Sequence, residues 1–392
     1  MNDFDIIIVG GGLVGSALAL ALGQENFHVA LVEQTPPPPI PGDASWDSRI
    51  YAITPGNADF LRRLGVWDAL EAARIAPIHA MRVWGDDGQA QLGFDAYEAG
   101  VPELGFIVEN RLMQDALWRA LRQQAHVELV CPARCAALEL SADAARLWLE
   151  DGLEGGRELR AKLAVGADGG GSWVRRQAGI AVKTLPYGQL GVVANFETEK
   201  PHGNIARQWF LRDGILAWLP LPGNRISMVW SAFEERAQAL LRLDAQAFCN
   251  AVAQAGHGDL GALRLMTPPA AFPLQLQRND AMIGLRLALV GDAAHLVHPL
   301  AGQGVNLGFR DVQTLAATLL NRGARDLGDH LLLRRYERAR KADILAMQAV
   351  TTGLQKLFND DDPWLGWLRN TGLAAVDRIA PLRRQLVAHA IV

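Results

Sequence analysis

Three glycines near the start of the chain constrain its fold more than any other feature. Gly10, Gly12 and Gly15 form the pattern G-x-G-x-x-G between an apolar run at 5–9 and a segment at 14–24 that is rich in alanine and leucine. A short continuous apolar run is typical of a buried parallel strand, and the segment that follows it is typical of a helix. A second apolar run comes next, so we expect a strand–helix–strand unit and a parallel sheet.

The same pattern predicts a binding site for a dinucleotide. The first glycine allows a tight turn, the second lets the backbone approach a pyrophosphate, and the third lets the helix pack closely on the strand. The start of the helix, which includes Leu13 and Val14, offers N–H groups and the positive end of the helix dipole. The second strand, at 27–32, ends at Glu33, whose carboxylate can accept hydrogen bonds from ribose hydroxyls. The motif alone does not distinguish NAD from FAD.

A second group of candidate residues lies near the other end of the chain. The apolar run 287–290 precedes Asp292, and residues 302–306 lead into a predicted helix. Ligands bind at the carboxyl ends of parallel strands, where the Asp292 carboxylate could hold a polyhydroxyl chain. The helix start suits a flavin ring whose pyrimidine edge becomes negatively charged. No carboxylate at helical spacing completes a metal site around His295 and His298, so we expect no metal ion.

Composition excludes several classes of protein. The chain has 392 residues, 50% of them hydrophobic, and a formal net charge of −4. Such a chain can bury a large core, and it lacks the excess of cations expected of a nucleic-acid-binding protein. Its three cysteines, Cys131, Cys135 and Cys249, are too few for a disulfide framework, which favours a reducing compartment. No apolar run is long enough to predict a membrane-spanning helix.

The pattern changes along the chain in a way that predicts an inserted domain. Residues 48–70 are predicted to be mostly helical, residues 81–94 to form a hairpin, and residues 110–123 to form a strong helix. Strand-like runs dominate 185–273, and the buried-strand pattern returns at 287–290. The first domain is therefore expected to be discontinuous. Aromatic residues of the inserted sheet are candidates for the wall of an apolar cavity, or else ordinary core residues: Trp209, Phe210, Trp218 and Trp230.

Several separated segments, in order, resemble a known family. With the glycine motif and Glu33, the segment Gly166-Ala167-Asp168-Gly169 resembles the single-component flavoprotein aromatic hydroxylases, which share the fold of p-hydroxybenzoate hydroxylase. The chain resembles the ubiquinone-biosynthesis hydroxylases more closely still. The segments that carry this resemblance are Asp47-x-Arg49-x-x-Ala52-Ile53, Leu64-Gly65-Val66-Trp67, Val108-Glu109-Asn110 and His298-Pro299-Leu300-Ala301-Gly302-Gln303-Gly304-Val305-Asn306-Leu307-Gly308. The resemblance covers essentially the whole chain.

The resemblance implies an α/β fold built from three parts. We expect a Rossmann-like FAD-binding domain with an inserted, largely antiparallel β-sheet substrate domain and a helical C-terminal tail. The expected boundaries are 1–76, 106–182 and 278–335 for the FAD-binding domain, 77–105 and 183–277 for the substrate domain, and 336–392 for the C-terminal region.

The resemblance also implies roles for individual residues toward FAD. Arg49 would approach the flavin or the pyrophosphate, or else be a solvent-paired arginine. Asn110 would contact FAD or cap the helix that it opens. Asp168 would contact FAD and nicotinamide, or else cap the helix that begins near Ser172. The expected cofactor-binding residues are Gly10, Gly12, Leu13, Val14, Gly15, Glu33, Arg49, Asn110, Cys135, Asp168, Asp292, Gly304, Val305 and Asn306.

The implied reaction is hydroxylation of the aromatic ring of a polyprenylated phenol in ubiquinone biosynthesis, with NADH or NADPH and dioxygen. Pro299, His295 and Gln303 are the catalytic candidates, and Pro299 would lie over the reacting face of the flavin. Catalysis would consist largely of positioning and water exclusion. The alternative is a flavin-bound, non-catalytic subunit of a biosynthetic complex.

The C-terminal tail is a candidate interface. It combines Trp364 and Trp367 with neighbouring leucines and with Arg383 and Arg384, a mixture suited to a membrane surface or a partner, although a helix docked on its own domain is an equal alternative. We expect a cytoplasmic protein with no nucleic-acid partner. Peripheral contact with the inner membrane, contact with proteins of a ubiquinone-biosynthesis complex, and a homo-oligomer remain open.

Overall fold

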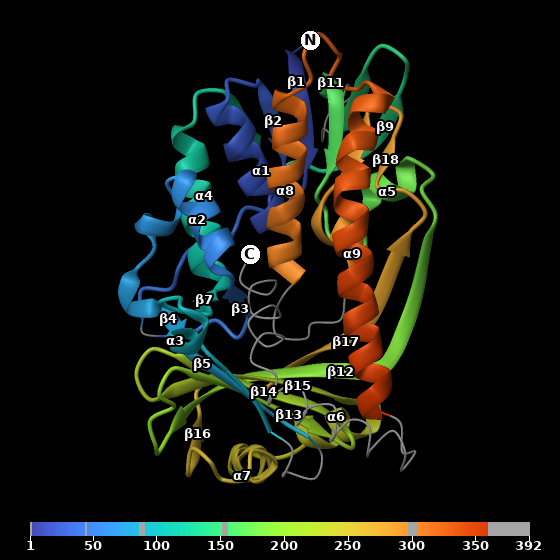
Figure 1. Cartoon of the computed structure of the whole chain (residues 1–392). Coiled ribbons are helices and arrows are strands. Elements are labelled where there is room, and N and C mark those ends of the chain that lie inside the picture. The colour runs from blue at the N-terminus through green and yellow to red at the C-terminus, as the bar shows by residue number, and fades with distance from the viewer. Residues whose placement is uncertain (1, 44, 86–90, 151–155, 297–303, 360–392) are drawn as a thin grey trace.

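The structure is a computed structural model that describes residues 2–43, 45–85, 91–150, 156–296 and 304–359. Its upper layer in Figure 1 is built on a largely parallel sheet, and its lower layer on a largely antiparallel one. The parallel strands of the upper sheet lie side by side in the order β8, β2, β1, β11, β19. The strands of this sheet are β1 (Asn2–Val9), β2 (Val29–Val32), β8 (Val127–Val130), β9 (Cys135–Leu140), β10 (Ala145–Leu149), β11 (Glu158–Gly166), β18 (Ile283–Gly284) and β19 (Leu287–Leu289).

This strand order places a reversal at the centre of the sheet. The chain winds from β1 outward through β2 to β8, and then returns to the other side of β1 with β11 and β19. In open parallel sheets, ligands bind at the carboxyl ends of the strands where the order reverses. That point lies between the end of β1 at Val9 and the end of β11 at Gly166, which pair with each other.

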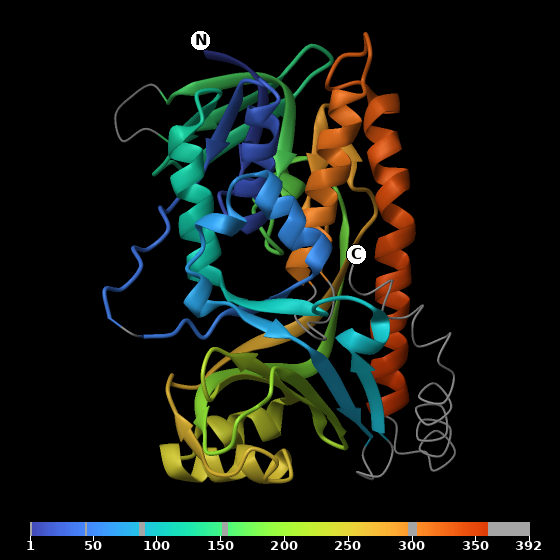
Figure 2. The ribbon, with the colours of Figure 1, turned by 60° about the vertical axis from the view of Figure 1, so that its left-hand side comes forward.

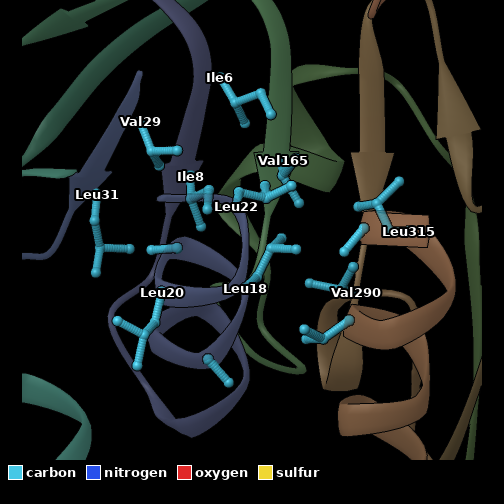
Figure 3. Packing of buried hydrophobic residues seen from close by; sticks show 14 of the residues in the cluster. Ile6, Ile8, Leu18, Leu20, Leu22, Val29, Leu31, Val165, Val290 and Leu315 are labelled. Atoms are coloured by element: carbon cyan, nitrogen blue, oxygen red, sulfur yellow. The ribbon is translucent and has the colours of Figure 1, made fainter. Parts of the chain in front are cut away.

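Apolar side chains of the sheet and its helices form the main core. Ile8 of β1 and Leu18 of α1 are fully buried, and complete burial of such a side chain is worth about 1.5–3 kcal/mol. Figure 3 shows leucines of α1 gathered with side chains of β1, β2, β11 and α8. The helices of this part are α1 (Leu13–Gln24), α2 (Pro55–Arg63), α4 (Asn110–Gln123), α5 (Trp173–Gln177), α8 (Gly304–Leu320) and α9 (His330–Asn359).

The second sheet confirms the predicted inserted antiparallel layer. Its strand order is β20, β17, β12, β15, β14, β13, β5, β6, and only the pairing of β13 with β5 is parallel. The predicted hairpin is present as β5 and β6, although its turn lies outside the described residues. The strands are β5 (Ala80–Trp84), β6 (Gln91–Asp95), β12 (Val182–Thr198), β13 (Ile205–Leu211), β14 (Gly214–Leu221), β15 (Arg225–Phe233), β16 (Leu263–Leu265), β17 (Ala270–Asn279) and β20 (His295–Leu296).

The tryptophans of this sheet take the second of the two roles that the sequence left open for them, as core residues. Trp209, Trp218 and Trp230 pack in one cluster with side chains of α6 (Glu234–Leu241) and α7 (Ala245–Ala255). Figure 2 shows these two helices on the side of the sheet away from the parallel layer. The three tryptophans are therefore core residues and do not wall a cavity that faces the first domain. Side chains alternate between the two faces of a strand, but the sequence does not tell which face lies against helices.

A small third sheet joins the two layers and corrects one expectation. Residues 48–70 were expected to be mostly helical, but Ile50–Ile53 form strand β3, which pairs with β7 (Gly105–Glu109). Pairing with a strand so distant in the sequence overrides the local helical pattern. On its other side β7 pairs with β4 (Ala76–Ile78), and the short helix α3 spans Ala96–Ala99.

The C-terminal helix α9 runs beside α8 and extends to the level of the antiparallel sheet (Figures 1 and 2). Trp364, Trp367, Arg383 and Arg384 lie outside the described residues, so their role as an interface stays a prediction. Among the helices that the structure describes, none combines the length and hydropathy needed to cross a membrane. The domain boundaries likewise stay predictions.

Candidate functional site

The glycine turn lies at the reversal point of the parallel sheet. Gly10 has φ +107°, and a Cβ there would lie 2.4 Å from the carbonyl oxygen of Ala167, so the turn requires glycine. A Cβ on Gly15 would lie 1.9 Å from the carbonyl oxygen of Gly10. Gly12 differs, because no atom of the described residues lies within 4 Å of the position of its Cβ. Gly10 and Gly15 therefore pack the protein, whereas Gly12 borders open space.

The start of α1 is suited to an anion. Gly12 is the N-cap residue and provides no side-chain hydrogen bond, and the first turn contains no acidic residue. Glu33, at the end of β2, accepts hydrogen bonds from the N–H groups of Gly11 at 2.6 Å and Thr35 at 3.0 Å. These bonds hold the carboxylate beside the glycine turn, as expected for a residue that accepts from a ribose.

Three parts of the chain meet around Val14. A Cβ on Gly308 of α8 would lie 2.6 Å from a Val14 methyl group and 3.4 Å from the Cα of Gly291. Gly291 has φ +59° and opens the turn that carries Asp292. One region is therefore surrounded by the start of α1, the Asp292 turn and the start of α8. The start of α1 lies nearly three hundred residues before the other two in sequence.

Asp292 is a half-buried carboxylate without a donor among the residues that the structure describes. Burial raises its pKa, while the positive charges of His295 and Arg49 act in the opposite direction. Arg49 also lies near the ring of Tyr51, with its guanidinium carbon 5.8 Å from the ring centroid. Burial raises the pKa of the Tyr51 phenol, and the charge of Asp292 adds to the effect. Sequence reasoning missed Tyr51, because only the fold brings it near Asp292.

Other predicted residues hold the structure of the site. The Asp168 carboxylate accepts from Ser172 Oγ at 2.5 Å and from the N–H groups of Trp173 and Val174 at 2.7 and 3.0 Å. It therefore caps α5, which is the alternative that the sequence left open. Its contact with a cofactor stays a prediction.

Asn110 does not cap α4. Glu109 is the N-cap residue, and Asn110 is the first residue of the helix, so the capping prediction is wrong. The backbone N–H of Asn110 donates to the carbonyl oxygen of Arg49 at 2.9 Å. This bond places Asn110 beside the strand that carries Arg49 and Tyr51. A contact between its side chain and the cofactor stays a prediction.

Asn306 has a structural role that the sequence did not indicate. Its Oδ1 accepts from the N–H of Thr54 and from Nδ2 of Asn57, each at 3.0 Å. Its Nδ2 donates to the carbonyl oxygen of Ala52 at 2.7 Å. The side chain therefore joins the start of α8 to the segment between β3 and α2. The neighbouring Val305 is buried, and no atom lies within 4 Å of a Cβ built on Gly304.

Only one of the three catalytic candidates lies among the described residues. Pro299 and Gln303 lie outside the described residues. His295 is buried, with Nε2 2.7 Å from Oδ2 of Asp311.

Cys135 is a half-buried thiol, and burial together with the charges of Asp168, Glu33 and Glu150 raises its pKa to about 12. Cys135 is therefore a neutral thiol at pH 7. Among the described side chains, no group of three or more His, Cys, Asp and Glu residues could hold a metal ion.

Comparison with known proteins assigns the family. A family model described as an FAD binding domain matches residues 3–351. The chain is also 40% identical to the 3-demethoxyubiquinol 3-hydroxylase of Escherichia coli (strain K12), over 99% of this chain and 98% of that protein. The chain belongs to the FAD-dependent ubiquinone-biosynthesis hydroxylases. Ubiquinone hydroxylase UbiL of Rhodospirillum rubrum is likewise 40% identical, over 99% of this chain and 89% of that protein.

A solved structure supports the same fold. The p-nitrophenol 4-monooxygenase PnpA of Pseudomonas putida DLL-E4 aligns with a TM-score of 0.79 at 18% identity, covering 99% of this chain and 98% of that one. The hydroxylase is thus an FAD-dependent monooxygenase. Its residues fit FAD, since the space beside Gly12 that the described residues leave free suits a pyrophosphate, and the Asp292 carboxylate, which has no donor among those residues, suits a hydroxylated chain.

Residues that the sequence did not single out support the glycine turn of the hydroxylase. The carbonyl oxygen of Gly11 accepts from Ser16 Oγ at 2.9 Å, Gln114 Nε2 at 2.6 Å and Trp118 Nε1 at 2.9 Å. Two of these donors lie on α4, so the turn is fixed by a helix a hundred residues away. Helical periodicity placed Gln114 and Trp118 on a helix but gave no signal for this contact.

Glu109 fixes the segment that carries Arg49. Its fully buried carboxylate accepts from Arg74 Nε and from the N–H of Asp47, each at 2.7 Å, and lies 3.1 Å from Arg111 Nε. The carboxylate of Asp47 in turn accepts from the N–H groups of Arg49 at 2.9 Å and Arg111 at 3.1 Å. Two carboxylates therefore hold the loop that leads into β3.

Replacement of Glu109 by glutamine should destabilise the protein measurably. The amide keeps the shape of the side chain but removes the charge that two arginines share, which is worth about 1–3 kcal/mol of unfolding free energy. Urea unfolding of the cofactor-free protein measures this loss. The control is Glu139→Gln, since Glu139 forms an exposed pair with Arg146 and its loss should cost under about 0.5 kcal/mol. Equal losses in both variants would contradict the account.

Proposed function

We propose that the hydroxylase adds one hydroxyl group to the aromatic ring of a polyprenylated phenol in ubiquinone biosynthesis. The balanced reaction consumes the phenol, dioxygen, NADH or NADPH, and a proton. It yields the hydroxylated phenol, water and the oxidised nicotinamide. The observation that carries the proposal is the 40% identity, along almost the whole of both chains, to a protein named for hydroxylating a demethoxyubiquinol.

The antiparallel sheet offers a suitable apolar surface toward the FAD-binding layer. Val193, Val229 and Ala217 lie opposite one another on three paired strands, in positions that alternate with the helix-covered cluster. The same face includes Asn195, whose Nδ2 donates to the carbonyl oxygen of Asp47 at 2.8 Å. Val193 and Val229 are half-buried, so this apolar face is not completely covered by described residues. A prenylated ring fits such a surface better than a polar substrate does.

The residues that would hold FAD follow from the geometry above. The start of α1 at Gly12 would receive the pyrophosphate, Glu33 the ribose, and Asp292 the ribityl chain. When bound and reduced, FAD supplies the activation of dioxygen. Val305 and Asn306 would offer N–H groups of the α8 start to the flavin. Roles for Pro299 and Gln303 stay predictions, because neither lies among the described residues.

The protein's own contribution to the reaction is position and the exclusion of water. Asn306 and Glu109 hold the segment that contains Asp47 and Thr54, and the apolar sheet face would keep solvent from the ring to be hydroxylated. This division of labour requires no protein nucleophile. The exposed Arg49 guanidinium is placed to contact an anionic part of the cofactor or the phenol oxygen.

A prenylated substrate also bears on location. Because such a phenol partitions into lipid, we propose peripheral contact between the hydroxylase and the inner membrane, or hand-over from a lipid-carrying partner of the same biosynthetic complex. Co-sedimentation with lipid vesicles that contain the substrate tests this contact. Recovery of all protein in the supernatant, at substrate loads that support turnover, would oppose it.

Turnover gives the first test of the proposed function. In purified FAD-loaded protein, a prenylated phenol should increase NADH or NADPH oxidation and yield one hydroxylated product for each nicotinamide consumed. A phenol without the prenyl chain is the matched control and should react more slowly at equal concentration. Nicotinamide oxidation without any hydroxylated product would favour a non-catalytic flavin-bound subunit instead.

A further inference from the structure

One buried ionic network has no place in the site described so far. Asp311 of α8 is fully buried, and its Oδ1 accepts from Nε of Arg340 on α9 at 2.7 Å. Its Oδ2 accepts from the N–H of Gly291 at 2.9 Å and lies 2.7 Å from Nε2 of His295. A buried charge with this many partners is costly to build, so its location calls for an explanation.

The two residues that contact Asp311 Oδ2 lie on either side, in sequence, of the residue proposed to hold the cofactor. Gly291 and His295 stand on either side of Asp292, and the N–H of Ala294 donates to the carbonyl oxygen of Gly291 at 2.9 Å to close the turn. Asp292 itself has no hydrogen bond of its side chain within the described structure. The direction of its carboxylate is therefore set by the backbone on either side, and both sides are tied to Asp311.

The opposite side of the turn is held as well. The carbonyl oxygen of Ala293 accepts from Arg175 at 3.1 Å and from Asn279 Nδ2 at 2.8 Å. The turn thus lies between the Arg175 guanidinium and the Asn279 amide on one side and an ionised carboxylate on the other. Burial acts to raise the pKa of Asp311, but the contacts with His295 and Arg340 lower it below its ordinary value. Asp311 therefore stays ionised at neutral pH.

We propose that Asp311 is a positioning residue, which orients the Asp292 carboxylate toward bound FAD, and that Arg340 extends this control to the C-terminal helix α9. Arg340 is itself buried, donates to Asp343 Oδ2 at 2.6 Å, and lies 3.5 Å from the carbonyl oxygen of Leu307. A displacement of α9 would be transmitted through one carboxylate to the cofactor turn. The inference rests on the proposed role of Asp292 in binding FAD.

The test measures FAD affinity of the cofactor-free protein by quenching of flavin fluorescence, in two backgrounds. Asp311→Asn should weaken FAD binding about tenfold or more, since it removes the charge that holds the turn. In the Asp292→Ala background, the same substitution should change affinity by less than about twofold, because a positioning residue has nothing left to position. Asp343→Asn is the matched control, as it removes the more exposed carboxylate bound to Arg340, and should have less than about a twofold effect.

A purely structural role for Asp311 would give a different pattern. It would weaken FAD binding by the same factor in both backgrounds, and that result would overturn the inference. So would an Asp311→Asn protein that folds and binds FAD as the natural protein does. If Asp311→Asn fails to fold, Arg340→Lys replaces it, since lysine keeps the charge but loses the bond geometry. About a threefold or greater weakening that disappears with Asp292→Ala is then expected.

The proposed contact of Asp292 with FAD and the inferred role of Asp311 would fail in distinguishable ways. If Asp292→Ala alone leaves FAD affinity unchanged, the proposed cofactor contact is wrong, and the inference about Asp311 falls with it. If Asp292→Ala weakens binding but Asp311→Asn does not, only the inference about Asp311 is wrong. Thermal unfolding of each cofactor-free variant separates both cases from a loss of fold.

Discussion

Replacing Gly12 by alanine should abolish FAD retention while leaving the cofactor-free fold intact. Its backbone has φ −69° and ψ −174°, which alanine adopts without strain, and none of the residues that the structure describes has an atom within 4 Å of the added Cβ. The methyl group would instead occupy the space proposed for the pyrophosphate. We expect FAD affinity to fall by about 100-fold, equivalent to about 2.7 kcal/mol, which lies within the usual cost of overpacking a tight contact.

Gly15 provides the contrast for this prediction. A Cβ at Gly15 would meet the carbonyl oxygen of Gly10 at 1.9 Å, so Gly15→Ala should lower the unfolding free energy of the cofactor-free protein by more than about 3 kcal/mol. Urea unfolding and flavin titration of both variants measure the two effects separately. Loss of stability in Gly12→Ala, or FAD binding by Gly12→Ala as tight as that of the natural protein, would show that Gly12 does not border the cofactor.

Substitution of Asp292 should have opposite effects on cofactor binding and on stability. Alanine removes the acceptor for the ribityl chain, and loss of hydrogen bonds to a charged group should weaken FAD binding by about 10- to 100-fold. Fluorescence titration of the cofactor-free protein measures this loss. An affinity for FAD equal to that of the natural protein would refute the proposed contact.

The sign of the stability effect follows from the raised pKa of Asp292 in the fold. Folding disfavours the ionised form, so the carboxylate destabilises the cofactor-free protein at neutral pH, and this cost vanishes as the pH falls toward about 4. Asp292→Asn should therefore melt about 1–2 °C higher than the natural protein at pH 7 without FAD. This difference in melting temperature should become smaller as the pH is lowered. A lower melting temperature for Asp292→Asn at pH 7 would contradict this reading.

The elements that depend on neighbouring residues alone were predicted correctly from the sequence. The glycine turn, its flanking strands and the helix at 110–123 were all expected, because close backbone approach and helical periodicity leave direct marks in the sequence. The strand at Ile50–Ile53 was not expected, because its cause is pairing with residues 106–109, more than fifty positions away. Likewise, the sequence left the tryptophans as cavity-wall or core residues, because it could not reveal that α6 and α7 cover their face of the sheet.

The candidate site was predictable in part for the same reason. Motif residues such as Gly12, Glu33 and Asp292 lie around the reversal point of the sheet, as their spacing suggested. The side-chain bonds of Asn306 and the network of Asp311 join segments that only the folded chain brings together. No spacing rule encodes such contacts. This explains why Asn306, which was predicted for the cofactor, also forms structural hydrogen bonds that the sequence did not indicate, whereas the capping role of Asp168 is local and was anticipated.

The proposed reaction inserts one atom of dioxygen into the ring of a prenylated phenol. The most direct measurement is mass spectrometry of the product formed by purified FAD-loaded protein under ¹⁸O₂, with NADH or NADPH as reductant. The account predicts a product heavier by one ¹⁸O atom, bonded to a ring carbon, and no label when ¹⁸O is supplied only as water. An unlabelled product, or label from water, would contradict it.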